Sequence, residues 1–183
     1  DDGKSFKTQI NLNRNTYGLD GNGSITVDRN GVVRVFWHAN LKDRHDRMAF
    51  MVQSANKGRS FSVEAPITSN PTGACECCTL EAFTTSTGKT FVAYRTAEKT
   101  GRDVVIFSSG THNSPFKEVH RHPWKVFTCP ASTFAFAEDA RKIYAAWETK
   151  GHIYVKDVLS SAASVNVSSA SKNCKYPSIA FNS

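Results

Sequence analysis

The sequence predicts an all-β fold, because short runs of alternating hydrophobic and polar residues recur along the chain and helical periodicity is nearly absent. These runs come in groups of four, and the groups repeat about every 45–55 residues. Turn-forming residues such as Asn30-Gly31 join the first two runs of a group. A four-stranded unit repeated at this interval is typical of the blades of a β-propeller. A two-sheet sandwich also uses short strands, but the aligned repeat favours the propeller.

Three complete units are expected. Their strands are predicted at 24–28, 32–38, 48–54 and 61–67; at 79–83, 90–95, 103–109 and 116–120; and at 132–136, 142–148, 152–158 and 163–168. Segments 7–12 and 176–181 are each expected to form one strand of a partial unit.

We therefore interpret residues 1–183 as one partial β-propeller domain. Its blades are expected at 1–19 (partial), 20–72, 73–126, 127–172 and 173–183 (partial). Because propellers need about four to eight blades to close a ring, we expect the chain to be a fragment of a six- or seven-bladed ring. The rest of its own propeller, or another chain, would complete the ring.

Two short motifs fall where the repeat places turns between third and fourth strands. The segment Ser54-Ala55-Asn56-Lys57-Gly58-Arg59-Ser60-Phe61 resembles the Asp-box, S-x-D-x-G-x-[ST]-[WF], of the sialidase-like (bacterial neuraminidase repeat) propellers, with Asn56 at the Asp position. The segment Asp1-Asp2-Gly3-Lys4-Ser5-Phe6 matches the same box without its leading serine. The resemblance implies a structural turn in which Asp1 or Asn56 bonds backbone N–H groups. Gly3 or Gly58 would adopt a special dihedral angle, and Phe6 or Phe61 would pack under the blade.

Polar residues end the second strand of each complete unit. His38, Arg95 and Glu148 each follow an aromatic residue there, and Arg102 and Asp103 lie in the loop after the second of these strands. In a propeller these positions converge on the central funnel, so the five residues are candidate ligand-binding residues. The alternative is a hydrogen-bond network that only joins neighbouring blades.

The five cysteines are expected on the same face, because they precede or begin the first strands of units. They are Cys75, Cys77, Cys78, Cys129 and Cys174. One interpretation is a structural disulfide from Cys77 or Cys78 to Cys129. Another is a copper or zinc site in which Cys129 or Cys174, and His38, complete a pair formed by Cys75 and Cys77. The third is a vicinal disulfide between Cys77 and Cys78.

The formal net charge of +7 favours an acidic partner, such as an acidic glycan or an acidic protein. Neither a nucleic-acid signature nor a run of about 20 apolar residues occurs, so we expect no nucleic-acid partner and no membrane span. Disulfides would place the protein outside the cytoplasm, in the periplasm or secreted.

The sequence thus favours an exported, non-catalytic binding module whose cysteine-rich face is its working surface. No cofactor other than copper or zinc at the cysteines is expected. The resemblance also implies an alternative, an exo-sialidase-like glycoside hydrolase with Arg95 and Arg102 near a substrate carboxylate and Asp103 or Glu148 nearby. The family's Phe-Arg-Ile-Pro motif and an assignable Tyr/Glu pair are absent from the sequence. A further alternative is a copper- or zinc-handling protein or redox partner.

Overall fold

The computed structural model describes residues 3–19, 22–43, 46–110, 114–168 and 173–181. They form three four-stranded antiparallel sheets, each a meander in chain order. Sheet one contains β1 (Ser24–Val27), β2 (Val33–Ala39), β3 (Met48–Ser54) and β4 (Ala65–Pro66). Sheet two contains β5 (Glu81–Thr84), β6 (Thr90–Arg95), β7 (Val104–Ser109) and β8 (Lys117–His122). Sheet three contains β9 (Phe134–Asp139), β10 (Lys142–Thr149), β11 (His152–Asp157) and β12 (Val165–Asn166). The predicted all-β class and the grouping of strands in fours are confirmed.

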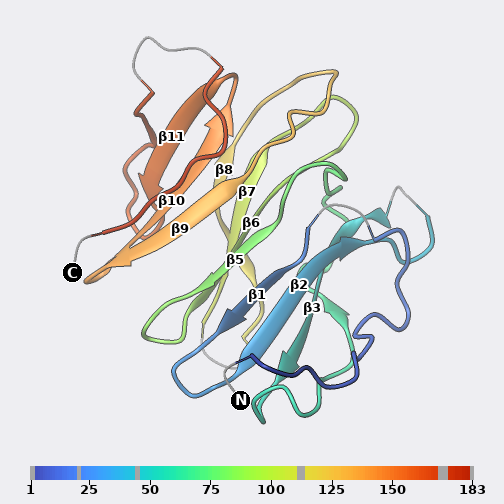
Figure 1. The fold of residues 1–183 in the computed structure, drawn as a ribbon. Helices are drawn as coiled ribbons and strands as arrows, with labels where there is room; N and C mark the ends of the chain where they lie inside the picture. Colours follow the sequence, from blue (N-terminus) through green and yellow to red (C-terminus); the bar gives the residue numbers. More distant parts are fainter. Residues whose placement is uncertain (1–2, 20–21, 44–45, 111–113, 169–172, 182–183) are drawn as a thin grey trace.

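The sheets lie side by side with sheet two in the middle (Figure 1). Their first strands are neighbours, since β1 contacts β5 and β5 contacts β9. Hydrogen bonds join consecutive sheets there: the Ala82 N–H of β5 donates to Ser24 Oγ of β1 at 3.0 Å, and the Ser86 N–H, in the turn after β5, donates to Glu138 Oε2 of β9 at 2.7 Å. Consecutive sheets are therefore held together along one edge.

Sheet two is buried on both faces, because every residue of β6 and β7 is buried. Side chains alternate between the faces of a strand. Val92 and Tyr94 pack with Phe36 of sheet one, and Phe91 packs with Trp147 of sheet three. This explains why β6 and β7 are almost continuously apolar in the sequence, whereas one-sided strands alternate.

The segments at the two ends differ from the prediction. Neither 7–12 nor 176–181 forms a strand, and β4 and β12 are shorter than predicted. A strand needs a hydrogen-bonded neighbour, and no strand pairing of either terminal segment occurs among the described residues. The C-terminal segment lies instead against the outer face of sheet three, where the Phe181 ring is 5.2 Å from that of Tyr144.

The turn at 54–61 is tightly hydrogen-bonded. Ser54 Oγ accepts from the Gly58 N–H at 2.8 Å, and Asn56 Oδ1 accepts from the Ser60 N–H at 2.9 Å. Gly58 has a φ of +80°, in the left-handed region that favours glycine. Phe61 packs against the outer hydrophobic cluster of sheet one.

The matching motif at the N-terminus forms only in part. Gly3 has a φ of +78°, as expected, but the Phe6 side chain is 93% exposed, so its expected packing does not occur. The ring has no surface to pack on, because segment 7–12 does not join a sheet. Ser5 is also exposed, and Asp1 lies outside the described residues.

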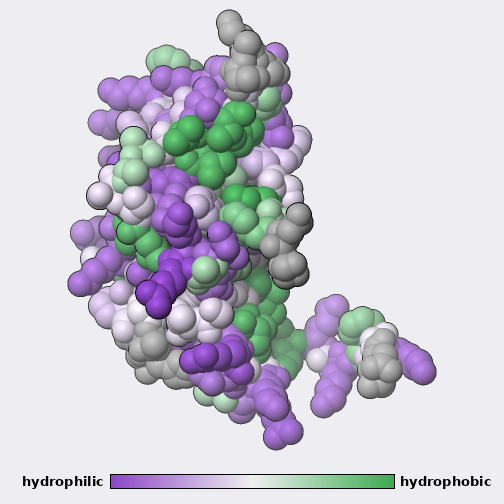
Figure 2. Space-filling view, turned by 90° about the vertical axis from the view of Figure 1, so that its left-hand side faces the viewer, coloured by the Kyte–Doolittle hydropathy of each residue, from purple (hydrophilic) through white to green (hydrophobic). Residues whose placement is uncertain are grey.

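The outer face of sheet three carries apolar side chains. Figure 2 views the molecule from this side, and hydrophobic residues form patches between polar ones. Val165 of β12 is 61% exposed there. Sheet one, at the other end of the row of sheets, also exposes an apolar side chain, since Ile25 of β1 is 65% exposed. Among all the described residues, no helix has the length and hydrophobicity needed to cross a membrane.

The layer between sheets two and three should dominate stability. We expect Phe91→Ala to lower the free energy of unfolding by about 3–5 kcal/mol, because Phe91 is fully buried and its removal leaves a cavity. Phe127→Ala is the matched control, since that ring is 91% exposed; it should change the free energy of unfolding by about 0.5 kcal/mol or less. Urea denaturation measures the free energy of unfolding of both variants. Similar losses for Phe91→Ala and Phe127→Ala would show that the layer between sheets two and three is not the core.

Candidate functional site

The loop that carries three of the cysteines is fixed to the end of β6. Gly73 has a φ of +58°, and a Cβ at this position would lie 3.0 Å from the carbonyl atoms of Ala97, so only glycine fits this close approach. The Ala97 N–H donates to Gly73 O at 2.9 Å, and the Cys75 N–H donates to Arg95 O at 2.8 Å. The cysteine loop is therefore anchored on both sides of Ala74.

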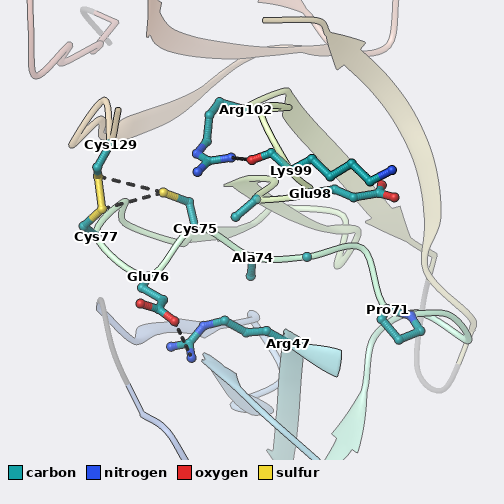
Figure 3. A pocket seen from close by; sticks show the side chains of 12 residues that line it. Arg47, Pro71, Ala74, Cys75, Glu76, Cys77, Glu98, Lys99, Arg102 and Cys129 are labelled. Atoms are coloured by element: carbon teal, nitrogen blue, oxygen red, sulfur yellow. Dashed lines mark hydrogen bonds and ion pairs between the residues drawn. A yellow bond between two sulfur atoms is a disulfide. The ribbon is translucent and has the colours of Figure 1, made fainter. Parts of the chain in front are cut away.

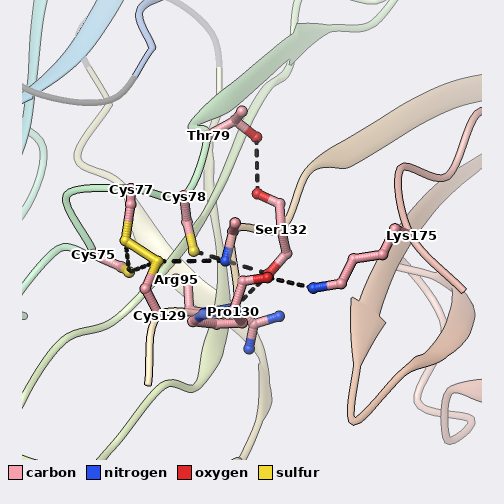
Figure 4. Close-up of a disulfide and its surroundings, with 10 residues drawn as sticks. Cys75, Cys77, Cys78, Thr79, Arg95, Cys129, Pro130, Ser132 and Lys175 are labelled. Atoms are coloured by element: carbon pink, nitrogen blue, oxygen red, sulfur yellow. Dashed lines mark hydrogen bonds between the residues drawn. A yellow bond between two sulfur atoms is a disulfide. The ribbon is translucent and has the colours of Figure 1, made fainter. Parts of the chain in front are cut away.

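Four cysteine sulfur atoms meet beside this loop (Figure 4). Cys77 and Cys129 form a disulfide. The sulfur of Cys75 lies 3.8 Å from that of Cys77 and 4.0 Å from that of Cys129. The sulfur atoms of Cys75, Cys78 and Cys129 lie within 4.8 Å of one another. The predicted approach of these four cysteines is confirmed.

Of the pairings left open by the sequence, the structure forms Cys77–Cys129. The vicinal disulfide is wrong, because Cys77 is bonded to Cys129 and Cys78 is a buried free thiol. Cys174 is also free and does not belong to the group of neighbouring sulfurs, nor does His38. A metal site that includes either residue is therefore not formed.

The two buried thiols differ in protonation. A hydrogen bond from the Cys75 thiol, the Ser132 N–H and the charge of Arg95 lower the pKa of Cys78 to about 6, against the opposing effect of burial. The same hydrogen bond, together with burial, raises the pKa of Cys75. The hydrogen bond between the two sulfurs therefore favours a thiolate on Cys78 over one on Cys75.

Arg95 links the surrounding segments, and its side chain is fully buried. Its Nε donates to Ser132 Oγ at 2.9 Å, its Nη1 to the Arg102 carbonyl at 2.5 Å, and its Nη2 to the Glu148 carbonyl at 2.5 Å. The guanidinium also lies over the Trp124 ring, 5.0 Å from its centroid. Arg95 therefore connects β6 to three other parts of the chain: the β6–β7 loop, the segment that precedes β9, and strand β10. All three hydrogen bonds of its guanidinium go to protein atoms.

His38 and Glu148 do not join Arg95 around one cavity. His38 is fully buried between sheets one and two, with its ring edge-on to Tyr94 at 5.3 Å. The Glu148 carboxylate accepts from the Gly151 N–H at 2.7 Å and lies 3.9 Å from Lys175 Nζ. It projects from the face of β10 opposite Trp147, which packs on sheet two. The three residues occupy three separate layers.

A pocket of about 660 Å³ opens beside the disulfide (Figure 3). It is formed by the β2–β3 and β6–β7 loops and by the segments that join sheet one to sheet two and sheet two to sheet three. The lining includes Arg47, Cys75, Glu76, Cys77, Glu98, Lys99, Arg102 and Cys129.

Arg102, a predicted site residue, lines this pocket. Its Nη1 donates to the carbonyls of Lys99 and Gly101 at 2.9 and 2.7 Å, whereas Nε has no hydrogen-bond partner among the described residues. Asp103 points elsewhere, because it accepts from Arg121 Nη1 at 2.9 Å and from the Trp124 N–H at 3.0 Å.

Sequence reasoning missed several residues of the site. Ser132 contacts both Arg95 and Cys78, but its sequence pattern predicts only a strand at 132–136 and no role in a site. Glu76, Glu98 and Lys99 line the pocket but were not selected. Their position beside Cys75, Cys77 and Arg102 in the same loops was the available signal.

No protein-family model matches the chain, and no curated protein matches it at a significant level.

Buried histidines should make stability depend on pH. Burial and the charge of Arg47 lower the pKa of His38 to about 3, and neither ring nitrogen has a hydrogen-bond partner in the part of the chain that the structure describes. Since an unfolded histidine has a pKa of about 6.5, the unfolded state binds more protons between pH 6.5 and 3. Stability is therefore expected to fall as pH decreases through this window. Urea denaturation at pH 7.5, 6 and 5 should show a smaller loss for His38→Phe than for the unchanged protein; equal losses would contradict the assignment.

The two arginines of the site should behave differently. Arg95→Lys is expected to lower the free energy of unfolding by about 3 kcal/mol, because lysine cannot replace all three buried charge-assisted hydrogen bonds. Arg102→Gln should cost about 0.5 kcal/mol or less, since its bonds are local and partly exposed. Chemical denaturation distinguishes the two, and a loss for Arg102→Gln as large as that for Arg95→Lys would refute the difference.

Proposed function

We propose that the chain is part of an exported, sialidase-like β-propeller that acts as a non-catalytic binding module. Its working surface is the pocket beside the Cys77–Cys129 disulfide, and its ligand is an acidic glycan or an acidic protein segment. The observation that carries this proposal is the pocket itself, because loops of sheets one and two and the segment that leads into sheet three meet there. Binding sites in repeat architectures are commonly built in this way, from loops on a rigid scaffold.

The propeller interpretation draws support from the stacking of the sheets. Three meanders follow one another in the chain, and their first strands are neighbours along one edge. The turn at 54–61, with Asn56 bonding Ser60 and with Gly58 at positive φ, has the features expected of an Asp-box. Exposed apolar residues such as Ile25 and Val165 give the outer faces surfaces that further blades, from this protein or from another chain, would cover.

The charges of the pocket support an anionic ligand. Arg47, Lys99 and Arg102 contribute three cationic groups, and Glu76 and Glu98 contribute two carboxylates. Glu76 Oε1 lies 3.8 Å from Arg47 Nη1, and this ion pair partly neutralises the positive charge on the Arg47 side of the pocket. The Lys99 and Arg102 side is therefore where a ligand carboxylate is expected to bind. The disulfide is consistent with an oxidising compartment, such as the periplasm or the extracellular space.

Titration of the full-length, oxidised protein with sialyllactose tests the proposal, and lactose serves as the neutral control ligand. We expect sialyllactose to bind and lactose to bind at least tenfold more weakly. Arg102→Gln should weaken sialyllactose binding at least tenfold, because it removes a cation from the pocket. Arg141→Gln makes the same charge change on an exposed residue outside the pocket and should have no effect.

Two results would overturn the proposal. Equal affinity for the two sugars would exclude recognition of the acidic group. Release of sialic acid during the titration would identify the protein as the hydrolase instead of a binding module.

A further inference from the structure

The cysteine cluster is layered, with an exposed disulfide over buried thiols. Cys77 and Cys129 are exposed, whereas Cys75 and Cys78 are only 3% and 1% exposed. Cys75, Cys77 and Cys129 all line the pocket, so the disulfide and one of the thiols face the same opening. A reductant can therefore reach the disulfide from outside, although the free thiols beneath it are covered.

The sulfur geometry suits a three-coordinate ion. Three thiolates at about 2.3 Å from a metal in a trigonal arrangement lie about 4 Å apart. The sulfurs of Cys75, Cys78 and Cys129 meet this requirement, since all lie within 4.8 Å of one another. Cys77 is not in that group, so the set offers three sulfurs and not the four that a structural zinc site normally uses.

We propose that Cys75, Cys78 and Cys129 form a site for copper(I) that is closed by the Cys77–Cys129 disulfide and opened by its reduction. This inference goes beyond the proposed function, because it assigns a second, redox-gated ligand to the same cysteine face. Soft thiolate ligands select copper(I). In the oxidised protein the sulfur of Cys129 is bonded to Cys77 and only two thiols remain, so the third ligand is missing.

The reduction step balances with an external dithiol. One thiolate of the dithiol attacks the exposed sulfur of Cys129 or Cys77, and the disulfide bond breaks as a mixed disulfide forms. The second thiol of the reductant then displaces the protein sulfur. The reductant leaves as its own disulfide, and Cys77 and Cys129 gain the two electrons and two protons. Copper(I) binding then releases the protons that remain on the three ligand sulfurs.

The segments that carry the proposed ligands are held in place by hydrogen bonds to Arg95. The main-chain bond from Cys75 to Arg95 and the Arg95–Ser132 bond hold the cysteine loop and the segment after Cys129 on the same residue. The ligands therefore come from two loops that are already positioned.

Anaerobic competition with a chromogenic copper(I) chelator tests the proposal on the full-length protein. The probe is copper(I) alone, with the protein either oxidised or reduced by a phosphine that is then removed. We expect the reduced protein to retain one copper(I) per chain at chelator concentrations where the oxidised protein retains less than a tenth. Equal retention in the two states would overturn the gating.

Matched cysteine variants identify the ligands. Cys78→Ser in the reduced protein should weaken copper(I) retention at least tenfold. Cys174→Ser makes the same change at a free cysteine outside the group and should leave retention unchanged. Full retention by Cys78→Ser, or an equal loss in both variants, would overturn the assignment.

A third measurement uses the protein without substitutions, so its result does not depend on whether a variant folds. Copper(I) should protect the exposed Cys129 of the reduced protein from alkylation, while Cys77, which is exposed but is not a ligand, and Cys174 still react. Alkylation of all the cysteines at the same rate, with or without copper(I), would refute the site. The sialyllactose titration uses metal-free oxidised protein, so failure of the glycan proposal and failure of the copper proposal are separate results.

Discussion

The position of the cysteine cluster depends on one buried residue, Arg95. Its carbonyl accepts the Cys75 N–H, which fixes the cysteine loop. Its guanidinium donates to Ser132, shortly after Cys129, and to the carbonyl of Glu148 on β10. A buried cation needs such partners, because an unpaired charge in this layer would be strongly destabilising. The same residue thus joins sheets two and three, brings the two cysteine-bearing segments together and favours a thiolate beside it.

Sheet two gives Arg95 its fixed position. Phe91 and Ala93, on the same face of β6, pack against sheet three, while Val92 and Tyr94 pack against sheet one. Because close-packed layers on both sides restrict movement of the strand, the end of β6 is a rigid base for the loops beyond it. Those loops carry the charged residues and the sulfurs. The candidate site therefore lies at the edge of the packed sheets, in loops that the sheets hold in position.

Much of this arrangement follows from the sequence. The short apolar runs predicted the strands closely for β2, β3, β6 and β10. The position of the cysteines before first strands predicted that Cys75, Cys77, Cys78 and Cys129 would approach each other, but it left open whether Cys77 or Cys78 pairs with Cys129. Pattern reasoning failed where the outcome depends on neighbours in space. Segment 7–12 has a strand pattern but no partner to pair with among the described residues, and the buried role of Arg95 depends on carbonyl groups that no motif reveals.

An exposed Cys77–Cys129 disulfide covers two buried thiols, Cys75 and Cys78. Disulfide mapping of the full-length protein, quenched in acid and alkylated before and after unfolding, tests it most directly. Trypsin places Cys75, Cys77 and Cys78 together in fragment 60–89 and Cys129 in fragment 126–141. These fragments should be linked through Cys77, and Cys75 and Cys78 should be alkylated only after unfolding. A link through Cys75 or Cys78, or rapid alkylation of both thiols in the folded protein, would contradict it.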